Sequence, residues 1–250
     1  MQEIILFPTE NWNVYTSDVE FGMHDADQNM RVKMSAITKH MAEIAGVDYT
    51  KRGYSHAFLW EKEMVFLLSR GSIKVHSPLL YEKEYTFTTW EHGMKGPQFF
   101  RNFEVHDRNS GEKMLSSTTS WLLVNPNTRK ILRPSEFFGE HRILEEKETD
   151  VTPTTKIAIP KQMEFAGERI VRYSDMDANG HMNNSNYSDI AFDFLPKEIT
   201  DQQVKEFAIN YNQEAKYGEK IDVYYNMIEN EAVVNGTVNG RSCFAVRLVV

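Results

Sequence analysis

The most informative stretch of this 250-residue chain is Tyr173-Ser174-Asp175-Met176-Asp177-Ala178-Asn179-Gly180-His181-Met182-Asn183-Asn184. It carries a carboxylate, an amide and an imidazole at alternate positions: Asp177, Asn179 and His181. Alternate residues of an extended segment point to one side, so these groups are expected to face a common volume. Apolar residues at helical spacing follow from Tyr187 to Leu195. This spacing predicts that the polar groups lie where a loop enters a helix.

A weaker copy of the same stretch lies 150 residues earlier. An ungapped shift superposes Asp27 on Asp177 and Asn29 on Asn179, and it also aligns the apolar positions that follow. Arg31 stands where the second copy has its histidine. The repeat therefore predicts two related halves, of which only the second carries the complete polar set.

The second copy resembles the Asp-x-Asn-x-His-Val-Asn-Asn motif of the acyl-acyl carrier protein thioesterases of plastids and bacteria. Other segments that resemble this family are Trp90–Gly96, Arg101–Glu104, Ser120–Val124 and Asn210–Ala215. Together they extend the resemblance from about Phe21 to the C-terminus. The resemblance implies an α+β fold of two tandem hotdog domains, each a curved antiparallel sheet wrapped around a long central helix, with the two sheets paired edge to edge.

The pattern along each half agrees with one helix followed by consecutive strands. The strands expected are Phe66–Ile73, Glu84–Trp90, Phe99–Val105, Met114–Val124, Phe207–Glu214, Ile221–Ile228, Glu231–Val238 and Ser242–Val250. Strands and helices do not alternate, which argues against a doubly wound parallel sheet. Residues 138–162 are rich in acids and hold two prolines, which indicates a linker. We therefore expect an N-terminal domain at 1–137, the linker at 138–162 and a C-terminal domain at 163–250.

The composition is that of an ordinary globular protein, with 41% hydrophobic and 26% charged residues. The net charge of -8 argues against nucleic acid as a partner. Met1–Pro8 lacks the features of a secretory leader, and no apolar run is long enough to span a membrane. A cytoplasmic protein is expected. Cys243 is the single cysteine, so an internal disulfide is excluded, and a packing role is predicted for it.

The resemblance implies that Asp177, Asn179, His181 and Glu214 form the catalytic site. Glu214 is expected on the polar face of its strand. In the family a cysteine follows this glutamate, but Ala215 stands there in this chain. A thiolate nucleophile at that position is therefore impossible.

The reaction that the resemblance implies is hydrolysis of fatty acyl-acyl carrier protein thioesters, which releases free fatty acid and terminates fatty acid biosynthesis. Glu214 is expected to act as general base or to position the water, with His181 and Asn179 aligning it. Asp177 would orient this network or, alternatively, act as nucleophile; the sequence does not choose between the two carboxylates. Backbone N–H groups near Gly180 and at the start of the second helix are the expected oxyanion donors. No metal and no organic cofactor is expected.

The expected partner is an acyl carrier protein that holds the acyl chain on its 4'-phosphopantetheine; a homodimer is an open option. For this acidic carrier, the basic residues proposed are Lys33, Lys39, Lys51, Arg52, Lys95 and Arg101. The residues proposed for the acyl pocket are Met34, Ile37, Met41 and Phe66, because flexible methionines suit an alkyl chain. Three alternatives stay open: an acyl-coenzyme A thioesterase, a hotdog 3-hydroxyacyl dehydratase and a non-catalytic acyl-binding module.

Overall fold

A computed structural model describes residues 13–250 of the chain. The segment Met1–Pro8, on which the prediction about a secretory leader rests, lies outside the described residues. Among residues 13–250, no helix combines the length and apolar character needed to cross a bilayer.

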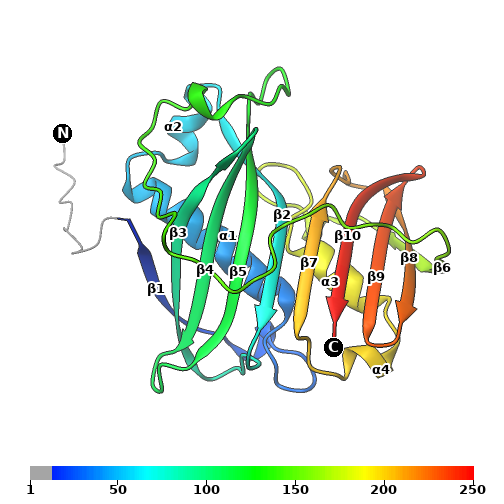
Figure 1. Cartoon of the computed structure of the whole chain (residues 1–250). Coiled ribbons are helices and arrows are strands. Elements are labelled where there is room, and N and C mark those ends of the chain that lie inside the picture. The colour runs from blue at the N-terminus through cyan, green and yellow to red at the C-terminus, as the bar shows by residue number, and fades with distance from the viewer. Residues whose placement is uncertain (1–12) are drawn as a thin grey trace.

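Ten strands within residues 13–250 form one continuous antiparallel sheet in the order β1-β3-β4-β5-β2-β7-β10-β9-β8-β6 (Figure 1). The strands of the first half are β1 (Tyr15–Glu20), β2 (Val65–Val75), β3 (Glu84–Lys95), β4 (Gln98–Asp107) and β5 (Lys113–Val124). Those of the second half are β6 (Glu164–Ile170), β7 (Glu206–Tyr211), β8 (Lys220–Ile228), β9 (Glu231–Val238) and β10 (Arg241–Val249).

The halves repeat the same strand order on either side of the β2–β7 junction, where the two strands pair antiparallel with Arg70 opposite Asn210 and Lys74 opposite Glu206. The expected edge-to-edge pairing is thus confirmed. Because each edge strand satisfies the other's backbone groups, the junction turns two sheets into one.

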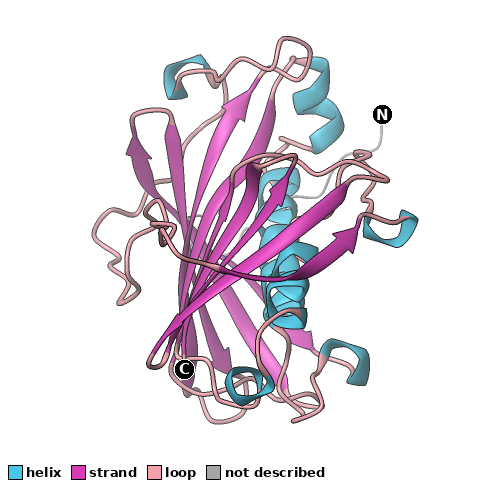
Figure 2. Ribbon diagram, turned by 90° about the vertical axis from the view of Figure 1, so that its right-hand side faces the viewer, coloured by secondary structure: helices cyan, strands magenta, loops and turns pink. Residues whose placement is uncertain are grey.

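The main helices, α1 (Met34–Lys51) and α3 (Asn186–Asp193), lie along one face of the sheet (Figure 2). The shorter helices are α2 (His56–Glu61) and α4 (Lys197–Thr200), and the 3-10 turns are η1 (Met23–Asp25), η2 (Pro134–Glu136) and η3 (Tyr173–Asp175). The expectation of a long helix in each half holds only for the first, because α3 has eight residues. Pro196 lies three residues past its end, and proline cannot continue a helix.

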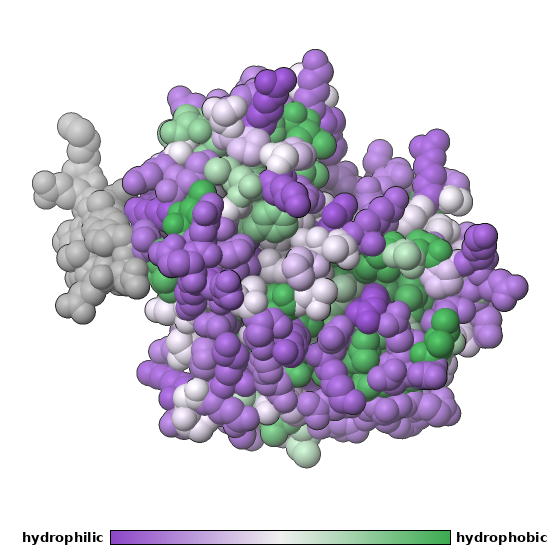
Figure 3. Space-filling model, viewed as in Figure 1, coloured by the Kyte–Doolittle hydropathy of each residue, from purple (hydrophilic) through white to green (hydrophobic). Residues whose placement is uncertain are grey.

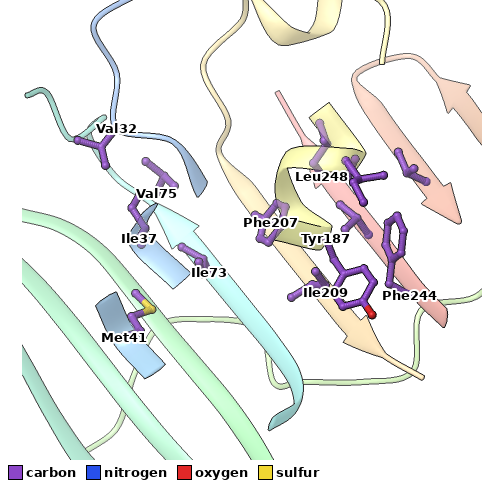
Figure 4. Close-up of a cluster of buried hydrophobic side chains, with 14 of the residues drawn as sticks. Val32, Ile37, Met41, Ile73, Val75, Tyr187, Phe207, Ile209, Phe244 and Leu248 are labelled. Carbon is purple, nitrogen blue, oxygen red and sulfur yellow. The ribbon is translucent and has the colours of Figure 1, made fainter. Parts of the chain in front are cut away.

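One hydrophobic core extends across both halves. Ile37 and Met41 of α1, and Tyr187 of α3, belong to the same buried cluster as Phe207 and Phe244 of the sheet (Figure 4). Burying a large apolar side chain contributes about 1.5–3 kcal/mol, so this shared cluster holds the two halves together.

The predicted linker, 138–162, contains no helix or strand: its first part runs beside β3, where Ile143 bridges Glu91, and its later part crosses the face of the sheet opposite the helices (Figure 1). The Asn210 side chain accepts from the Ile157 N–H at 2.8 Å and donates to the Thr155 carbonyl at 3.0 Å. Ser116 donates to the Asp150 carboxylate at 2.6 Å. Hydrophilic side chains dominate this face, with apolar patches between them (Figure 3). These bonds fasten the later part of the predicted linker to the sheet.

Candidate active site

The segment Asp177–His181 forms a tight turn, which corrects the expectation of an extended segment. The Asp177 N–H donates to the His181 carbonyl at 2.8 Å, and the Gly180 N–H donates to the Asp177 carbonyl at 3.0 Å. The Asp177 carboxylate accepts from the N–H groups of Asn179 at 2.8 Å and His181 at 3.3 Å. Gly180 has a φ of 73°, which few residues other than glycine adopt without strain. The carboxylate thus holds the turn closed.

The residues on either side fix this turn to the fold. Asp175 is buried, and its carboxylate accepts from Arg169 and from the Arg172 N–H, both at 2.7 Å. Downstream, the Asn183 side chain accepts from the Ser185 N–H at 2.9 Å. Helix α3 begins at Asn186, so a short connection separates the turn from the helix.

Glu214 lies in a loop and not in a strand, because β7 ends at Tyr211. Its Oε1 is nevertheless 3.4 Å from Nδ1 of His181. The next residue, Ala215, is buried and donates its N–H to the Tyr187 hydroxyl at 3.0 Å. Burial raises the pKa of Tyr187, which keeps this hydroxyl protonated. The contact ties the loop to α3 and holds Glu214 beside the imidazole.

Arg129 is a site residue that the sequence reasoning missed. It belongs to the first half, and its guanidinium lies 3.3 Å from Glu214 Oε1. No signal in the sequence could have identified it, because it stands in an ordinary turn 85 positions before the glutamate. Glu214 therefore lies between an imidazole from its own half and a guanidinium from the other.

A cleft of about 1110 Å³ contains Asp177, Asn179, His181 and Glu214, so the structure brings all four predicted catalytic residues together. The opposite wall comes from the first half and includes Trp60, Phe66 and Trp121. A neighbouring cavity of about 320 Å³ shares Phe66 and Trp121 with the cleft and runs along the C-terminal part of α1. The candidate active site at the junction of the halves therefore has an apolar side pocket.

The four residues proposed for the acyl pocket do not share one cavity. Phe66 lines the cleft, and Met41 borders a small void beside it. Met34 and Ile37 line a second cleft of about 590 Å³, together with Asp27 and Arg31. The reason is the length of α1: its rise of about 1.5 Å per residue carries these two side chains roughly 15 Å away from the cavity end of the helix.

Two further expectations concern single side chains. Arg52 and Arg101, proposed to meet an acidic carrier, have side chains only 5% exposed and form ion pairs inside the protein, so they cannot serve that purpose. Cys243 is buried as expected, and burial raises the pKa of its thiol to about 12.

Comparison with known proteins gives the same assignment for both halves. The acyl-ACP thioesterase N-terminal domain matches residues 12–139, and the acyl-ACP thioesterase C-terminal domain matches residues 160–241. Oleoyl-acyl carrier protein thioesterase 2 of Arabidopsis thaliana (chloroplastic) is 21% identical over 78% of this chain and 58% of its own length. The palmitoyl-acyl carrier protein thioesterase of the same plant is 25% identical over 62% of this chain and 40% of its own. The chain thus spans less than two thirds of the length of these relatives.

Solved structures agree on the fold. An acyl-ACP thioesterase from Bacteroides thetaiotaomicron has a TM-score of 0.86 at 23% identity, covering 94% of this chain and 97% of that one. The 12:0-ACP thioesterase from Umbellularia californica has a TM-score of 0.80 at 16% identity, covering 97% and 98%. These matches confirm the predicted fold of two tandem hotdog domains. With both domain matches, covering most of its length, the chain belongs to the acyl-ACP thioesterase family.

Proposed function

We propose that this protein hydrolyses fatty acyl thioesters carried by acyl carrier protein and releases free fatty acid. The observation that carries the proposal is the His181–Glu214 pair, 3.4 Å apart, in a cleft that continues into an apolar cavity. A thioester carbonyl at the pair would have its alkyl chain in the cavity and its carrier arm toward the solvent.

In the proposed reaction, Glu214 together with His181 removes a proton from water as the water oxygen attacks the thioester carbon. The tetrahedral oxyanion then collapses, the carbon–sulfur bond breaks, and the leaving thiolate takes the proton back. The products are a carboxylic acid and the thiol of the carrier arm. Asp177 is the positioning residue, because its carboxylate already accepts two N–H groups of the turn.

The oxyanion needs a hydrogen-bond donor. The N–H groups of Asn179, Gly180 and His181 all donate within the turn. Donation by N–H groups at the start of α3 stays a prediction. The Asn179 side-chain amide lines the cleft and is exposed, so we assign this role to it.

The acyl chain is proposed to lie in the first half. Helix α1 carries Ala42, Ala45 and Gly46 on the face that lines the 320 Å³ cavity. The 150-residue shift places Phe192, Leu195 and Pro196 at these positions in the second half. Small side chains leave room beside α1, whereas the corresponding positions of the second half carry larger side chains, and two of them lie past the end of α3.

The proposal also specifies that the acyl group is carried by acyl carrier protein. Family membership and the names of the relatives, which are acyl carrier protein thioesterases, support a carrier protein in preference to coenzyme A. The cytoplasmic location and the homodimer stay predictions.

The test is release of free thiol from a panel of acyl-carrier proteins and matched acyl-coenzymes A. The proposal expects a higher kcat/KM for the carrier protein at every chain length, and loss of turnover in Glu214→Gln. Equal kcat/KM for acyl-carrier proteins and acyl-coenzymes A would indicate an acyl thioesterase without a preference for the carrier protein. Absence of hydrolysis would overturn the proposed function, and full activity of Glu214→Gln would overturn the role given to Glu214.

A further inference from the structure

Four charged side chains form a buried ionic cluster between α1 and the sheet: Asp48 of α1, Arg52 directly after α1, Glu91 of β3 and Arg101 of β4. Arg52 lies 2.5 Å from Glu91, and Arg101 lies 2.7 Å from Asp48. Their cross contacts, Arg52–Asp48 and Arg101–Glu91, measure 3.5 and 3.7 Å. Two positive and two negative charges thus balance one another away from water.

The cluster occupies one end of the apolar cavity. Glu91 and Arg101 line the cavity, but neither lines the active-site cleft. Phe66 and Trp121 line both, so they mark the end nearest the His181–Glu214 pair. An alkyl chain that enters from the cleft therefore passes apolar side chains first and meets paired charges last.

The same cluster holds the first part of the linker over the cavity. Glu91 accepts from the Arg142 N–H at 3.0 Å through its side chain and from the Leu144 N–H at 2.9 Å through its backbone carbonyl. Arg52 donates to the Glu140 carbonyl at 2.5 Å. Two linker residues between these anchors, His141 and Ile143, line the cavity. Charges and linker together make up its far wall.

We propose that this far wall, formed by the ionic cluster with His141 and Ile143, sets the upper limit of acyl-chain length. The inference rests on the proposed function. Each methylene gains apolar contact until the chain reaches the wall. A longer chain would have to separate buried ion pairs, which is costly because it leaves uncompensated charges in the interior. The specificity constant should therefore rise with chain length and then fall steeply.

The experiment measures kcat/KM for saturated acyl-carrier proteins of increasing length with the full chain and with two wall variants. Ile143→Ala and His141→Ala enlarge the far end and leave both arginines paired. Each should raise kcat/KM for chains just beyond the wild-type optimum by roughly tenfold, the usual effect of one methylene in an apolar pocket. Ile157→Ala is the matched control, because Ile157 is a buried linker isoleucine on the opposite face of the sheet.

A third variant moves the limit in the other direction. A Cβ added at Gly46 meets no atom within 4 Å, and Gly46 lines the cavity, so Gly46→Leu has open space at its Cβ and is expected to extend into the cavity. Leucine is also a better helix former than glycine, so α1 should persist. This variant should shift the optimum to shorter chains.

The outcomes separate the two proposals. If the wild-type protein releases no thiol from any acyl donor, the proposed function fails. If it does, but the folded Ile143→Ala, His141→Ala and Gly46→Leu variants keep the wild-type chain-length profile, the wall lies elsewhere and this inference fails. An equal shift of the chain-length profile in Ile157→Ala would also overturn the inference about the far wall. Melting temperatures identify any variant that is unfolded. Of the three variants, Gly46→Leu is the one expected to unfold least.

Discussion

The turns Asp27–Arg31 and Asp177–His181 have almost the same backbone hydrogen bonds but different roles. In both, the first N–H donates to the last carbonyl at 2.8 Å. In both, the aspartate carboxylate accepts from two backbone N–H groups of the turn. The N–H of the residue two positions later donates at 2.8 Å in each turn. The N–H of the residue four positions later donates at 3.0 Å in the first turn and at 3.3 Å in the second. The two halves therefore share the same hydrogen-bonded turn before their main helix.

The last side chain of each turn makes the difference. Arg31 pairs with Asp27 at 3.0 Å and donates to the carbonyls of Thr200 and Gln202 at 2.8 and 2.6 Å. It fastens the first half to the second. His181 instead faces Glu214 and the open cleft. One turn serves the interface and the other serves the proposed chemistry, so the aspartate alone is no sign of catalysis.

The strongest test of this contrast replaces the last residue of each turn. His181→Ala should lower kcat/KM by roughly 10²–10⁴, the usual contribution of a positioned acid–base group, with little change in melting temperature. Arg31→Ala should keep kcat/KM within a few-fold. It should lower stability by roughly 2 kcal/mol because charge-assisted hydrogen bonds are lost. Thermal unfolding and thiol release measure both variants. Equal loss of activity at equal stability would mean that the second cleft also takes part in the reaction.

The halves also differ in what ties the helix to the sheet, because the first half adds the ionic cluster to its apolar contacts. Burial alone would raise the pKa of Glu91, but its hydrogen bond to His141 and the Arg52 and Arg101 charges outweigh burial and hold the pKa at about 2. The ordinary value is 4.5. Since the folded pKa is the lower one, Glu91 stabilises the fold above about pH 4.5, and this contribution is lost as the pH falls toward 2.

The expected loss is on the order of 3 kcal/mol across that window. Denaturant unfolding at pH 6 and pH 3.5 measures the upper part of this window, where about 1.4 kcal/mol should be lost. Glu91→Gln serves as the control, because it removes the titrating group. Stability that falls as much in the variant as in the wild type would assign the acid sensitivity to other carboxylates.

The next comparison changes only the aspartates. Asp177→Asn keeps an oxygen that can accept both N–H groups, so the turn should persist. Turnover should fall roughly tenfold to hundredfold because a charge beside His181 is removed. Asp27→Asn loses its ion pair with Arg31, which should cost about 1 kcal/mol of stability and little turnover. Turnover numbers and melting temperatures of the Asp177→Asn and Asp27→Asn variants test this expectation. A larger loss of turnover in Asp27→Asn would reverse the roles given to the halves.

Much of the fold could be read from the sequence, because local patterns determine it. The repeat located both polar segments, although not their turn geometry, and the apolar spacing after each one located α1 and α3. The expected strand Glu231–Val238 coincides with β9. The pairing of β2 with β7 came only from the family resemblance, since nothing in the spacing of one strand names its partner.

The placement of Glu214 could not be read because it depends on the neighbouring strand. Polar residues alternate past Tyr211, which favours a longer strand, but β10 bulges between Ser242 and Phe244. The Cys243 carbonyl accepts from both Asn212 and Gln213, so the ladder stops there. Arg129 and the cavity beside α1 likewise arise from contacts between distant segments, which no local pattern reports.

The smallest effect is expected at Cys243, the one thiol of the chain. Ala215 occupies the family cysteine position, and the Cys243 thiol is buried with its pKa raised to about 12, so little thiolate forms near neutral pH. Its Sγ lies 3.2 Å from the Gly236 carbonyl, which a serine hydroxyl can also meet. Cys243→Ser should therefore keep turnover within a few-fold, and a thiol-alkylating reagent should leave the wild type active. If turnover were lost in a Cys243→Ser protein of unchanged melting temperature, the reaction would need the sulfur, and the assignment of its chemistry to the second turn and Glu214 would be wrong.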